Sequence, residues 1–364
     1  MMAYKLKVEG LRKTYGSVVA LGGASLEMEE GEFLTLLGPS GSGKTTMLLL
    51  LAGLIQPDEG EIWIDGQLAT YTPVHRRDIG MVFQNYALFP HLSVFENIAF
   101  PLRMRKRPEG EIAERVRAIL EAVRLPQVAE RLPRELSGGQ QQRIALARCT
   151  VYRPSIILMD EPLGALDKKL RDQMQLEIKH LHTQLGITVL YVTHDQEEAM
   201  VMSDRICLMN DGAIVQLGTP DDLYFRPRTV FAADFLGESN IFEATVVEVR
   251  GRAVTLSGPA GVALRVEADV TPPAGAAVSC MVRPENVRLL FDGEQAPNQL
   301  DATLSDVIVV GGITKHYARL ADGRQVSATA LTTGPGRAAR PGEKVRLGWE
   351  PERTVVIERK APSP

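Results

Sequence analysis

Residues 38–45 read Gly-Pro-Ser-Gly-Ser-Gly-Lys-Thr, and they stand between a short apolar run, 33–37, and a helical pattern that begins at Lys44. Glycines let the backbone turn tightly and bring N–H groups close to a phosphate, and the N-terminus of the following helix adds its positive dipole. The order strand, glycine-rich loop, helix predicts a buried strand and a phosphate-binding loop. We expect Lys44 to contact the β- and γ-phosphates and Thr45 to offer its hydroxyl to Mg²⁺.

Two further apolar runs end in polar residues that suit the same chemistry. The run 155–159 leads to Asp160 and Glu161. Asp160 suits the outer shell of Mg²⁺, and Glu161 is placed to orient or deprotonate an attacking water. The run 188–192 leads to His194, which we expect at the carboxyl edge of a parallel sheet, where ligands bind in open α/β folds. Taken alone, each of these groups would suit an ordinary strand end.

A second glycine-rich segment, Leu136-Ser-Gly-Gly-Gln140, opens a helical pattern over 140–152. Its N–H donors make a second helix end that favours anions. Together with the loop and the acidic pair, this segment makes the chain resemble the ATP-binding subunits of ABC transporters over roughly residues 4–236. The resemblance implies ATP and Mg²⁺ as cofactors, and an α/β P-loop NTPase fold with a RecA-like core and a helical subdomain at about 90–150.

The resemblance also assigns roles to single residues. Tyr15 matches the aromatic that stacks on adenine, Gln84 the glutamine that senses Mg²⁺ and the γ-phosphate, and His194 the switch histidine. Asp167, in Ala165-Leu166-Asp167, matches the loop that crosses the dimer interface. The implied catalytic residues are Glu161, His194, Gln84 and Lys44; the implied ATP-contacting residues are Tyr15, Gly38, Pro39, Ser40, Gly41, Ser42, Gly43, Lys44, Thr45 and Thr46; the implied metal-binding residues are Thr45, Gln84 and Asp160.

One chain carries one phosphate loop and one Leu-Ser-Gly-Gly-Gln segment, and in ABC proteins these two face different nucleotides. The resemblance therefore implies a homodimer that sandwiches two ATP molecules, and poor hydrolysis by a lone subunit. The residues that would act on the ATP of a second copy are Ser137, Gly138, Gly139, Gln140 and Asp167.

Composition limits the classes of function. The chain has 364 residues, 41 of them basic and 45 acidic, for a net charge of −4, so it lacks the basic character typical of nucleic-acid-binding proteins. Its three cysteines are widely spaced and form neither a metal pattern nor a disulfide framework, which favours a reducing cytoplasm. The first residues lack the apolar core of a signal peptide. The longest apolar stretch, 47–55, is too short to cross a bilayer, so other chains would form any membrane path.

The pattern changes after residues 237–240. Long helical patterns give way to two successive sets of short alternating runs, one over 241–291 and one over 300–357. Regularly spaced short strands predict small β-barrels, duplicated or paired. With the arrangement at 281–287, this region resembles the OB-like accessory domain called TOBE. We therefore divide the chain into an ATP-binding domain, 1–236, and an all-β domain, 237–364, that stabilises the dimer, regulates it or senses an anion or solute.

The resemblance implies the ATP-hydrolysing subunit of an importer, bound to the cytoplasmic face of the inner membrane. Two separate permease subunits would carry the solute, delivered to them by a solute-binding protein, with no nucleic acid involved. The aromatic segment 85–91 would receive the permeases, although a packed loop is the plain alternative. The spermidine/putrescine importers are most similar, at 100–103, 168–171, 174–179 and 237–240.

Other functions stay open beside this one. Sugar, glycerol-phosphate, iron and sulfate importers share most of these features. A soluble ABC ATPase acting on DNA would carry a long heptad insertion before the Leu-Ser-Gly-Gly-Gln segment, and a ribosomal one would carry two cassettes. A GTPase or small-molecule kinase lacks that segment, and the chain has no Asn-Lys-x-Asp guanine motif.

Overall fold

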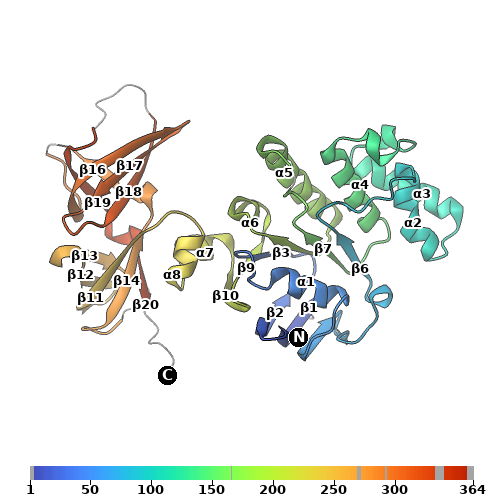
Figure 1. Cartoon of the computed structure of the whole chain (residues 1–364), viewed down its shortest axis with the longest axis horizontal. Helices are drawn as coiled ribbons and strands as arrows, with labels where there is room; N and C mark the ends of the chain where they lie inside the picture. Colours follow the sequence, from blue (N-terminus) through green and yellow to red (C-terminus); the bar gives the residue numbers. More distant parts are fainter. Residues whose placement is uncertain (1–3, 165, 269–271, 292, 333–339, 359–364) are drawn as a thin grey trace. The chain divides into compact units, whose positions relative to one another are not determined.

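The structure is a computed structural model that describes residues 4–164, 166–268, 272–291, 293–332 and 340–358. It divides into two compact units, Met1–Pro220 and Asp221–Pro364 (Figure 1). The sequence-based domain boundary at 236/237 stays a prediction; the short helices α7 (Pro220–Phe225) and α8 (Val230–Phe235) lie between the two positions.

A largely parallel sheet forms the centre of the first unit, with strands in the order β10-β9-β3-β8-β7-β6. All of its neighbouring strands run parallel except β10, which is antiparallel to β9. The three runs expected to be buried strands are present as β3, β7 and β8. The bounds are β3 Phe33–Leu37, β6 Ile79–Val82, β7 Ile156–Asp160, β8 Val189–Thr193, β9 Arg205–Asn210 and β10 Ala213–Gly218.

The central strands are apolar throughout because both faces are covered. In β3, Leu34 and Leu36 face a core shared with helix α1 (Lys44–Ala52) and with an antiparallel sheet of order β2-β1-β4-β5. Phe33 joins the opposite core, which the other helices build. Strands buried on both faces need no polar alternation. The antiparallel strands are β1 Leu6–Tyr15, β2 Val18–Met28, β4 Glu59–Ile64 and β5 Gln67–Leu68.

The predicted helical subdomain is present as α2, α3 and α4, which lie together in Figure 1. The amphipathic pattern is correct, since Ile112, Val116 and Leu120 of α3 are buried. The helix expected over 140–152 begins two residues earlier, because Ser137 caps it. The bounds are α2 Val94–Met104, α3 Glu109–Ala122, α4 Gly138–Thr150, α5 Lys168–Leu185 and α6 Gln196–Met202, with 3₁₀ turns η1 Val74–Arg76, η2 Pro126–Val128 and η3 Pro133–Glu135.

After α8, the described part of the second unit is built from strands and short 3₁₀ turns, which confirms the expected all-β region. Its described strands form two antiparallel sheets, β13-β12-β11-β14-β20 and β15-β19-β16-β17-β18, around one shared core in which Phe242 stacks on Trp349. The bounds are β11 Asn240–Arg250, β12 Ala253–Ser257, β13 Ala263–Glu267, β14 Ala277–Val282, β15 Arg288–Leu290, β16 Asn298–Val310, β17 Ile313–Arg319, β18 Gln325–Leu331, β19 Lys344–Trp349 and β20 Thr354–Glu358, with 3₁₀ turns η4 Pro259–Gly261, η5 Pro284–Asn286 and η6 Pro351–Arg353.

The sequence predicted duplicated or paired barrels, and in the structure the two sets of strands are joined by an exchange of strands. Each set gives its last strand to the other sheet: β15 pairs with β19 of the second set, and β20 pairs with β14 of the first. The exchange joins the sheets around a single core, and local periodicity could not reveal it.

No described helix of the chain combines the length and the apolar character that a bilayer crossing would require.

A buried arginine fastens the C-terminal end of α1. Arg77 is 3% exposed, and its guanidinium donates to the carbonyl oxygens of Leu50 and Leu51 at 2.8 and 2.7 Å. It also donates to the carbonyls of Thr70 and Thr72, both at 2.8 Å. A cation at this helix end satisfies free carbonyls and complements the helix dipole. Arg77 thus fixes the C-terminal end of α1, the helix that follows the phosphate loop.

We predict that Arg77→Met lowers the free energy of unfolding by about 3 kcal/mol, because buried carbonyls lose a charged donor. Urea denaturation of the full chain measures this change. Arg76→Met is the matched control, since Arg76 is exposed, and it should change stability by less than about 0.5 kcal/mol. Equal stability of the two variants would contradict the anchoring role.

Candidate functional site

The carboxyl ends of four parallel strands meet at one edge of the central sheet. Leu37 of β3 lies opposite Thr193 of β8, and Asp160 of β7 lies opposite Val192. Val82 of β6 in turn lies opposite Met159. The residues that directly follow these ends are the predicted ones: the loop with Lys44, then His194, Glu161 and Gln84.

The phosphate loop encloses its own lysine. The ammonium of Lys44 donates to the carbonyls of Gly38 and Pro39 at 2.8 and 2.9 Å, and it lies 3.5 Å from the hydroxyl of Ser42. Burial lowers the pKa of Lys44, against the opposing charges of Glu161 and Asp160. The ammonium group of Lys44 is thus held inside the curve of the loop, between the loop backbone and the two carboxylates.

Gly43, like Gly38, is a tightly packed point of the loop. It has a φ of +98°, and a side chain there would bring its Cβ to 2.4 Å from the carbonyl oxygen of Ala20. Only glycine fits both the conformation and the space. The contact presses the start of α1 against β2, which fixes the direction in which the loop N–H groups point.

Both members of the acidic pair are in unfavourable environments: the charge of Asp160 is partly buried, and the backbone of Glu161 is strained. Burial, followed by the charge of Glu161, raises the pKa of Asp160, and Lys44 opposes the rise. Glu161 itself adopts a φ of +44°, a conformation that costs a non-glycine residue about 1–3 kcal/mol. Its backbone N–H donates to Val192 at 3.0 Å, which ties this conformation to strand β8. Such strain gathers at functional sites.

His194 contacts the predicted water-activating group. Its Nδ1 lies 3.1 Å from Oε1 of Glu161, while its ring remains largely exposed. Gln84 approaches the same turn from β6: a side chain at Gly164 would place its Cβ 3.6 Å from Nε2 of Gln84 and 3.5 Å from the carbonyl of Glu161. Gln84 and His194 therefore both approach the turn that begins at Glu161.

Tyr15 ends β1 with its ring about half exposed. The neighbouring backbone is held by Asp58, which accepts hydrogen bonds from Lys13, from the N–H of Thr14 and from its hydroxyl, at 2.7–2.8 Å. These bonds, that from Lys13 first, lower the pKa of Asp58 to about 2. The tyrosine is therefore an exposed aromatic surface on a firmly held strand end, as stacking on a base requires.

The Leu-Ser-Gly-Gly-Gln segment forms a capped helix start on α4. The hydroxyl of Ser137 accepts from the N–H of Gln140, and the side chain of Gln140 accepts from the N–H of Ser137, which is a capping box. Gly139 lets α5 approach, since a Cβ there would lie 3.2 Å from Met174. Asp167 caps α5 by accepting from Leu170 at 3.0 Å.

Within the described residues, no hydrogen bond or ion pair joins the positions 137–140 or Asp167 to the loop 38–46. The two candidate anion-binding helix ends are thus separate structures within the chain. Of the segment 165–167, Ala165 lies outside the described residues.

The residues at the loop suit a hard cation. The described part of the chain has no group of three or more His, Cys, Asp or Glu side chains able to hold a metal ion alone. Mg²⁺ typically binds one or two protein oxygens together with substrate phosphates. The hydroxyl of Thr45, the amide of Gln84 and the carboxylate of Asp160 offer such oxygens. Burial, followed by the charge of Glu161, raises the pKa of Asp160, so a cation beside this carboxylate would be stabilised. The donor set therefore fits Mg²⁺.

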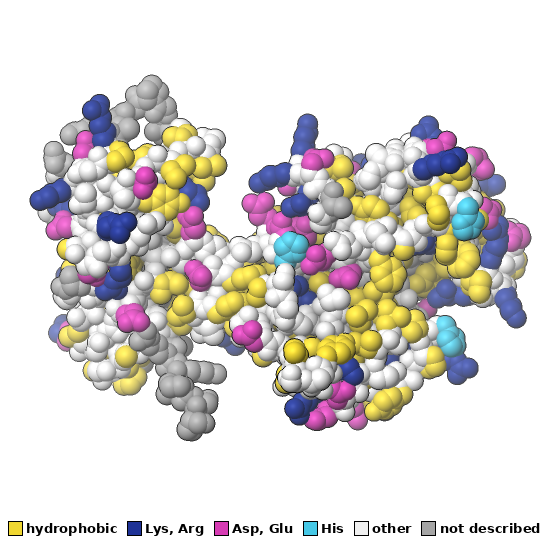
Figure 2. Space-filling view, viewed as in Figure 1, with side chains coloured by type: hydrophobic (Ala, Val, Ile, Leu, Met, Phe, Trp, Pro, Cys, Tyr) yellow, Lys and Arg dark blue, Asp and Glu magenta, His cyan; other side chains and the backbone are white. Residues whose placement is uncertain are grey.

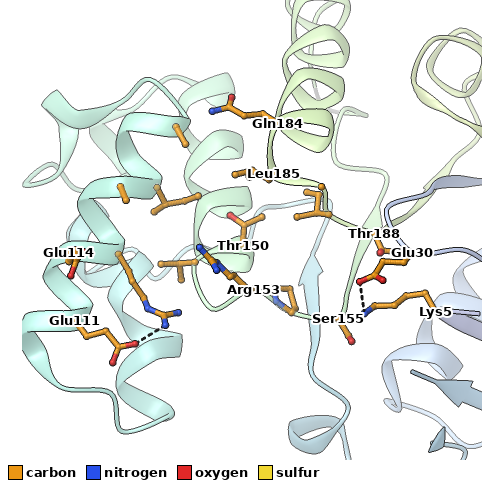
Figure 3. Close-up of a pocket in the computed structure, with 18 residues that line it drawn as sticks. Lys5, Glu30, Glu111, Glu114, Thr150, Arg153, Ser155, Gln184, Leu185 and Thr188 are labelled. Carbon is orange, nitrogen blue, oxygen red and sulfur yellow. Dashed lines mark ion pairs between the residues drawn. The ribbon is translucent and has the colours of Figure 1, made fainter. Parts of the chain in front are cut away.

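A cavity of ≈ 870 Å³ lies away from these groups, between α3 and the amino ends of β7 and β8 (Figure 3). Its charged lining is already paired in part: Arg115 binds Glu111 at 2.7 Å, and Lys5 lies 3.6 Å from Glu30. None of the predicted site residues lines it, so cavity size does not mark the site here. On the face drawn in Figure 2, basic and acidic side chains are interspersed, which gives no basic stripe there for nucleic acid.

Comparison with known families and sequences gives consistent results. Residues 21–164 match the model of the ABC transporter family, and residues 280–357 match that of the TOBE domain. The "Spermidine/putrescine import ATP-binding protein PotA" of Rubrobacter xylanophilus is 45% identical, over 97% of this chain and 93% of that protein. The "Putrescine transport ATP-binding protein PotG" of Escherichia coli is 42% identical, over 97% and 94%.

Solved structures resemble the first unit. The "Dimeric Structure of MJ0796, a Bacterial ABC Transporter Cassette" is 37% identical, with a TM-score of 0.53 over 59% of this chain and 98% of that one. A post-hydrolysis state of the same cassette, bound to ADP and Pi, has a TM-score of 0.52 and the same identity and coverage. The cbiO1 protein of Clostridium perfringens, part of the ABC transporter complex cbiONQ, is 30% identical, with a TM-score of 0.57 over 61% and 90%.

We predict that Gly43→Ala weakens ATP binding at least about 10-fold, because the strained conformation and the contact with Ala20 displace the loop. Titration with a fluorescent ATP analogue measures the affinity. Gly110→Ala is the control: Gly110 lies on α3 with no atom within 4 Å of the added Cβ, so its nucleotide affinity should be that of the unmodified protein. Unchanged affinity in Gly43→Ala would contradict the steric argument.

Proposed function

The chain belongs to the family of ABC transporter ATP-binding subunits and is an ATPase, and from this premise we propose that it energises the import of polyamines such as spermidine and putrescine. The observation that carries the proposal is the extent of the similarity. Relatives named for spermidine/putrescine or putrescine transport match 97% of the chain, including the second unit. Importers of sugars or anions remain the alternative for the solute, because the site described above contacts only the nucleotide.

The proposed ATP site uses the groups gathered at the sheet edge. Adenine stacks on Tyr15, and the phosphates lie in the loop 38–46 against the ammonium of Lys44. Thr45, Gln84 and Asp160 would hold Mg²⁺, which would neutralise phosphate charge. Glu161 orients the attacking water and accepts its proton. The contact of His194 with Oε1 of Glu161, at 3.1 Å, supports a role in orienting that carboxylate beside the γ-phosphate.

The proposed site is completed by a second copy. Ser137 and the N–H groups of Gly138 and Gly139, at the capped start of α4, face the γ-phosphate bound by the other subunit, and Asp167 crosses the interface. Two features support this arrangement: the separation of the two helix ends within one chain, and the dimeric form of a solved relative. Preorganised donors of this kind stabilise the charge that develops during phosphoryl transfer.

Separate permease subunits, together with a solute-binding protein, form the remainder of the proposed importer, and the ATPase lies peripherally on the cytoplasmic face of the membrane. The segment 85–91 is the proposed docking surface. Phe89 contacts Phe100 of α2 at 4.7 Å between ring centroids, and Arg148 fastens the segment by donating to the carbonyls of Tyr86 and Ala87. Aromatic side chains on a firmly held segment suit the anchors of a protein interface.

We predict that Glu161→Gln and Ser137→Arg each retain ATP binding and lower turnover about 100-fold or more, since one removes the base and the other blocks the partner's site. The two variants should then complement each other. In a mixed dimer, one site receives both changes and the other receives neither. Random mixing should restore up to about a quarter of the unmodified turnover. A mixture as inactive as its components would contradict a pocket shared between subunits.

We predict that cells lacking this protein lose uptake of radiolabelled spermidine and putrescine but retain uptake of a labelled sugar. A plasmid carrying the unmodified chain should restore polyamine uptake, and one carrying Glu161→Gln should not, because turnover drives the transport. Loss of sugar uptake with polyamine uptake intact would assign the chain to the alternative class of importer.

A further inference from the structure

A network of polar side chains connects the segment before α5 to the strand end that carries His194. Its central residue is Arg171, in the first turn of α5. One guanidinium nitrogen, Nη2, donates to the carbonyl of Leu166 at 3.1 Å. Another, Nη1, donates to Oδ2 of Asp195 at 3.1 Å. The side chain of Arg171 thus connects the loop that ends at Asp167 with the loop that contains His194 and Asp195. These two loops are far apart in the sequence.

Asp195, which Arg171 binds, directly follows His194 and is itself held by hydrogen bonds. Asp195 caps α6 by accepting from the N–H groups of Glu197 and Glu198, and its own N–H donates to the hydroxyl of Thr193 at 3.0 Å. The backbone residues on both sides of His194 are therefore fixed by hydrogen bonds. The imidazole ring itself is largely exposed and has Glu161 as its charged contact, so the position of the ring depends on these neighbours.

A buried carboxylate completes the network. Glu198 is 2% exposed and accepts hydrogen bonds from the hydroxyls of Tyr191 and Thr193 at 2.8 and 2.7 Å. Its other oxygen lies 3.8 Å from Nε of Arg171, and that Nε is buried without a hydrogen-bond acceptor. A buried donor without an acceptor is costly. The separation of 3.8 Å leaves room for this contact to tighten into a hydrogen bond when the two loops shift.

We propose that Arg171 is a positioning residue that holds His194 in register with the Leu166–Asp167 segment, so that docking of a second copy on that segment sets the His194–Glu161 contact. The inference rests on the proposed function, in which Asp167 crosses the dimer interface and His194 lies beside the γ-phosphate. It adds a physical link between the two: a planar guanidinium group that donates hydrogen bonds to Leu166 and to Asp195. Arginine suits this role because its guanidinium presents several donors in one fixed plane.

The test compares Arg171→Met with Lys179→Met in the full chain. Methionine keeps most of the length of either side chain and removes its donors. Lys179 also joins α5 to α6, donating to the carbonyl of Val201 at 2.8 Å, but it contacts neither loop, so it is the matched control. ATP turnover is measured against ATP concentration at a protein concentration that saturates the rate. Thermal unfolding is followed for each variant.

We expect Arg171→Met to lower kcat about 10-fold and to change KM for ATP by less than about threefold, because a misplaced histidine affects the reacting complex while the nucleotide-binding loop is untouched. When Arg171→Met is combined with Glu161→Gln, the doubly substituted chain should still dimerise in the presence of ATP, as measured by analytical ultracentrifugation. Lys179→Met should retain kcat within about twofold. Arg171→Lys keeps the charge but cannot span both acceptors, so its kcat should fall between those of Arg171→Met and the unmodified chain.

Two results would overturn the inference. One is a kcat for Arg171→Met equal to that of Lys179→Met. The other is a joint loss of dimerisation, affinity and turnover, which would make Arg171 a general structural residue. Where Arg171→Met does not fold, Asp195→Asn serves instead, since asparagine still caps a helix but lacks the charge that Arg171 binds. If the unmodified chain does not hydrolyse ATP, the proposed function itself is refuted. If it hydrolyses ATP normally and the Arg171 variants have the same kcat, only the positioning role of Arg171 is refuted.

Discussion

The parallel pairing of β3, β8, β7 and β6 is the constraint on which the site depends. Because the strands are bonded in register and covered on both faces, their carboxyl ends cannot shift separately, and the groups that follow them lie at fixed relative positions. The backbone of Glu161 is itself bonded to β8. The strained backbone of Glu161 and the buried ammonium of Lys44 can then be kept in place beside His194, although both conformations are unfavourable in a free peptide.

The carboxyl edge of this sheet holds only some of the groups proposed to act on ATP. The loop and the acidic pair lie at strand ends, whereas Ser137 and Asp167 begin helices that pack against each other and bond to nothing in the loop among the described residues. Gly139 is a point of close approach between those helices. The proposed site thus consists of two separate surfaces of the chain, and assembly of two chains brings one of each together in the proposed arrangement.

The sequence predicted local structure well and long-range pairing poorly. Lys44, Asp160, Glu161 and His194 follow strands whose apolar runs are visible locally, so their gathering at one edge follows from the parallel fold. The start of α4 could have been placed correctly, because Ser137 and Gln140 spell a capping box. Arg77 and Arg171 gave no such signal: their acceptors lie up to 27 residues away and are met only in the folded chain. The roles of the site residues in catalysis remain predictions, since they rest on motif and geometry together.

The exchange of strands in the second unit has a consequence for synthesis on the ribosome. The first sheet needs β20, which occupies positions 354–358, to cover the edge of β14. Until those residues have left the exit tunnel, the nascent domain presents an unpaired strand edge, a known hazard for association with other chains. The first sheet must therefore wait for its last strand before it is complete, and a frameshift or stop codon shortly upstream of that strand would leave the edge of β14 unpaired.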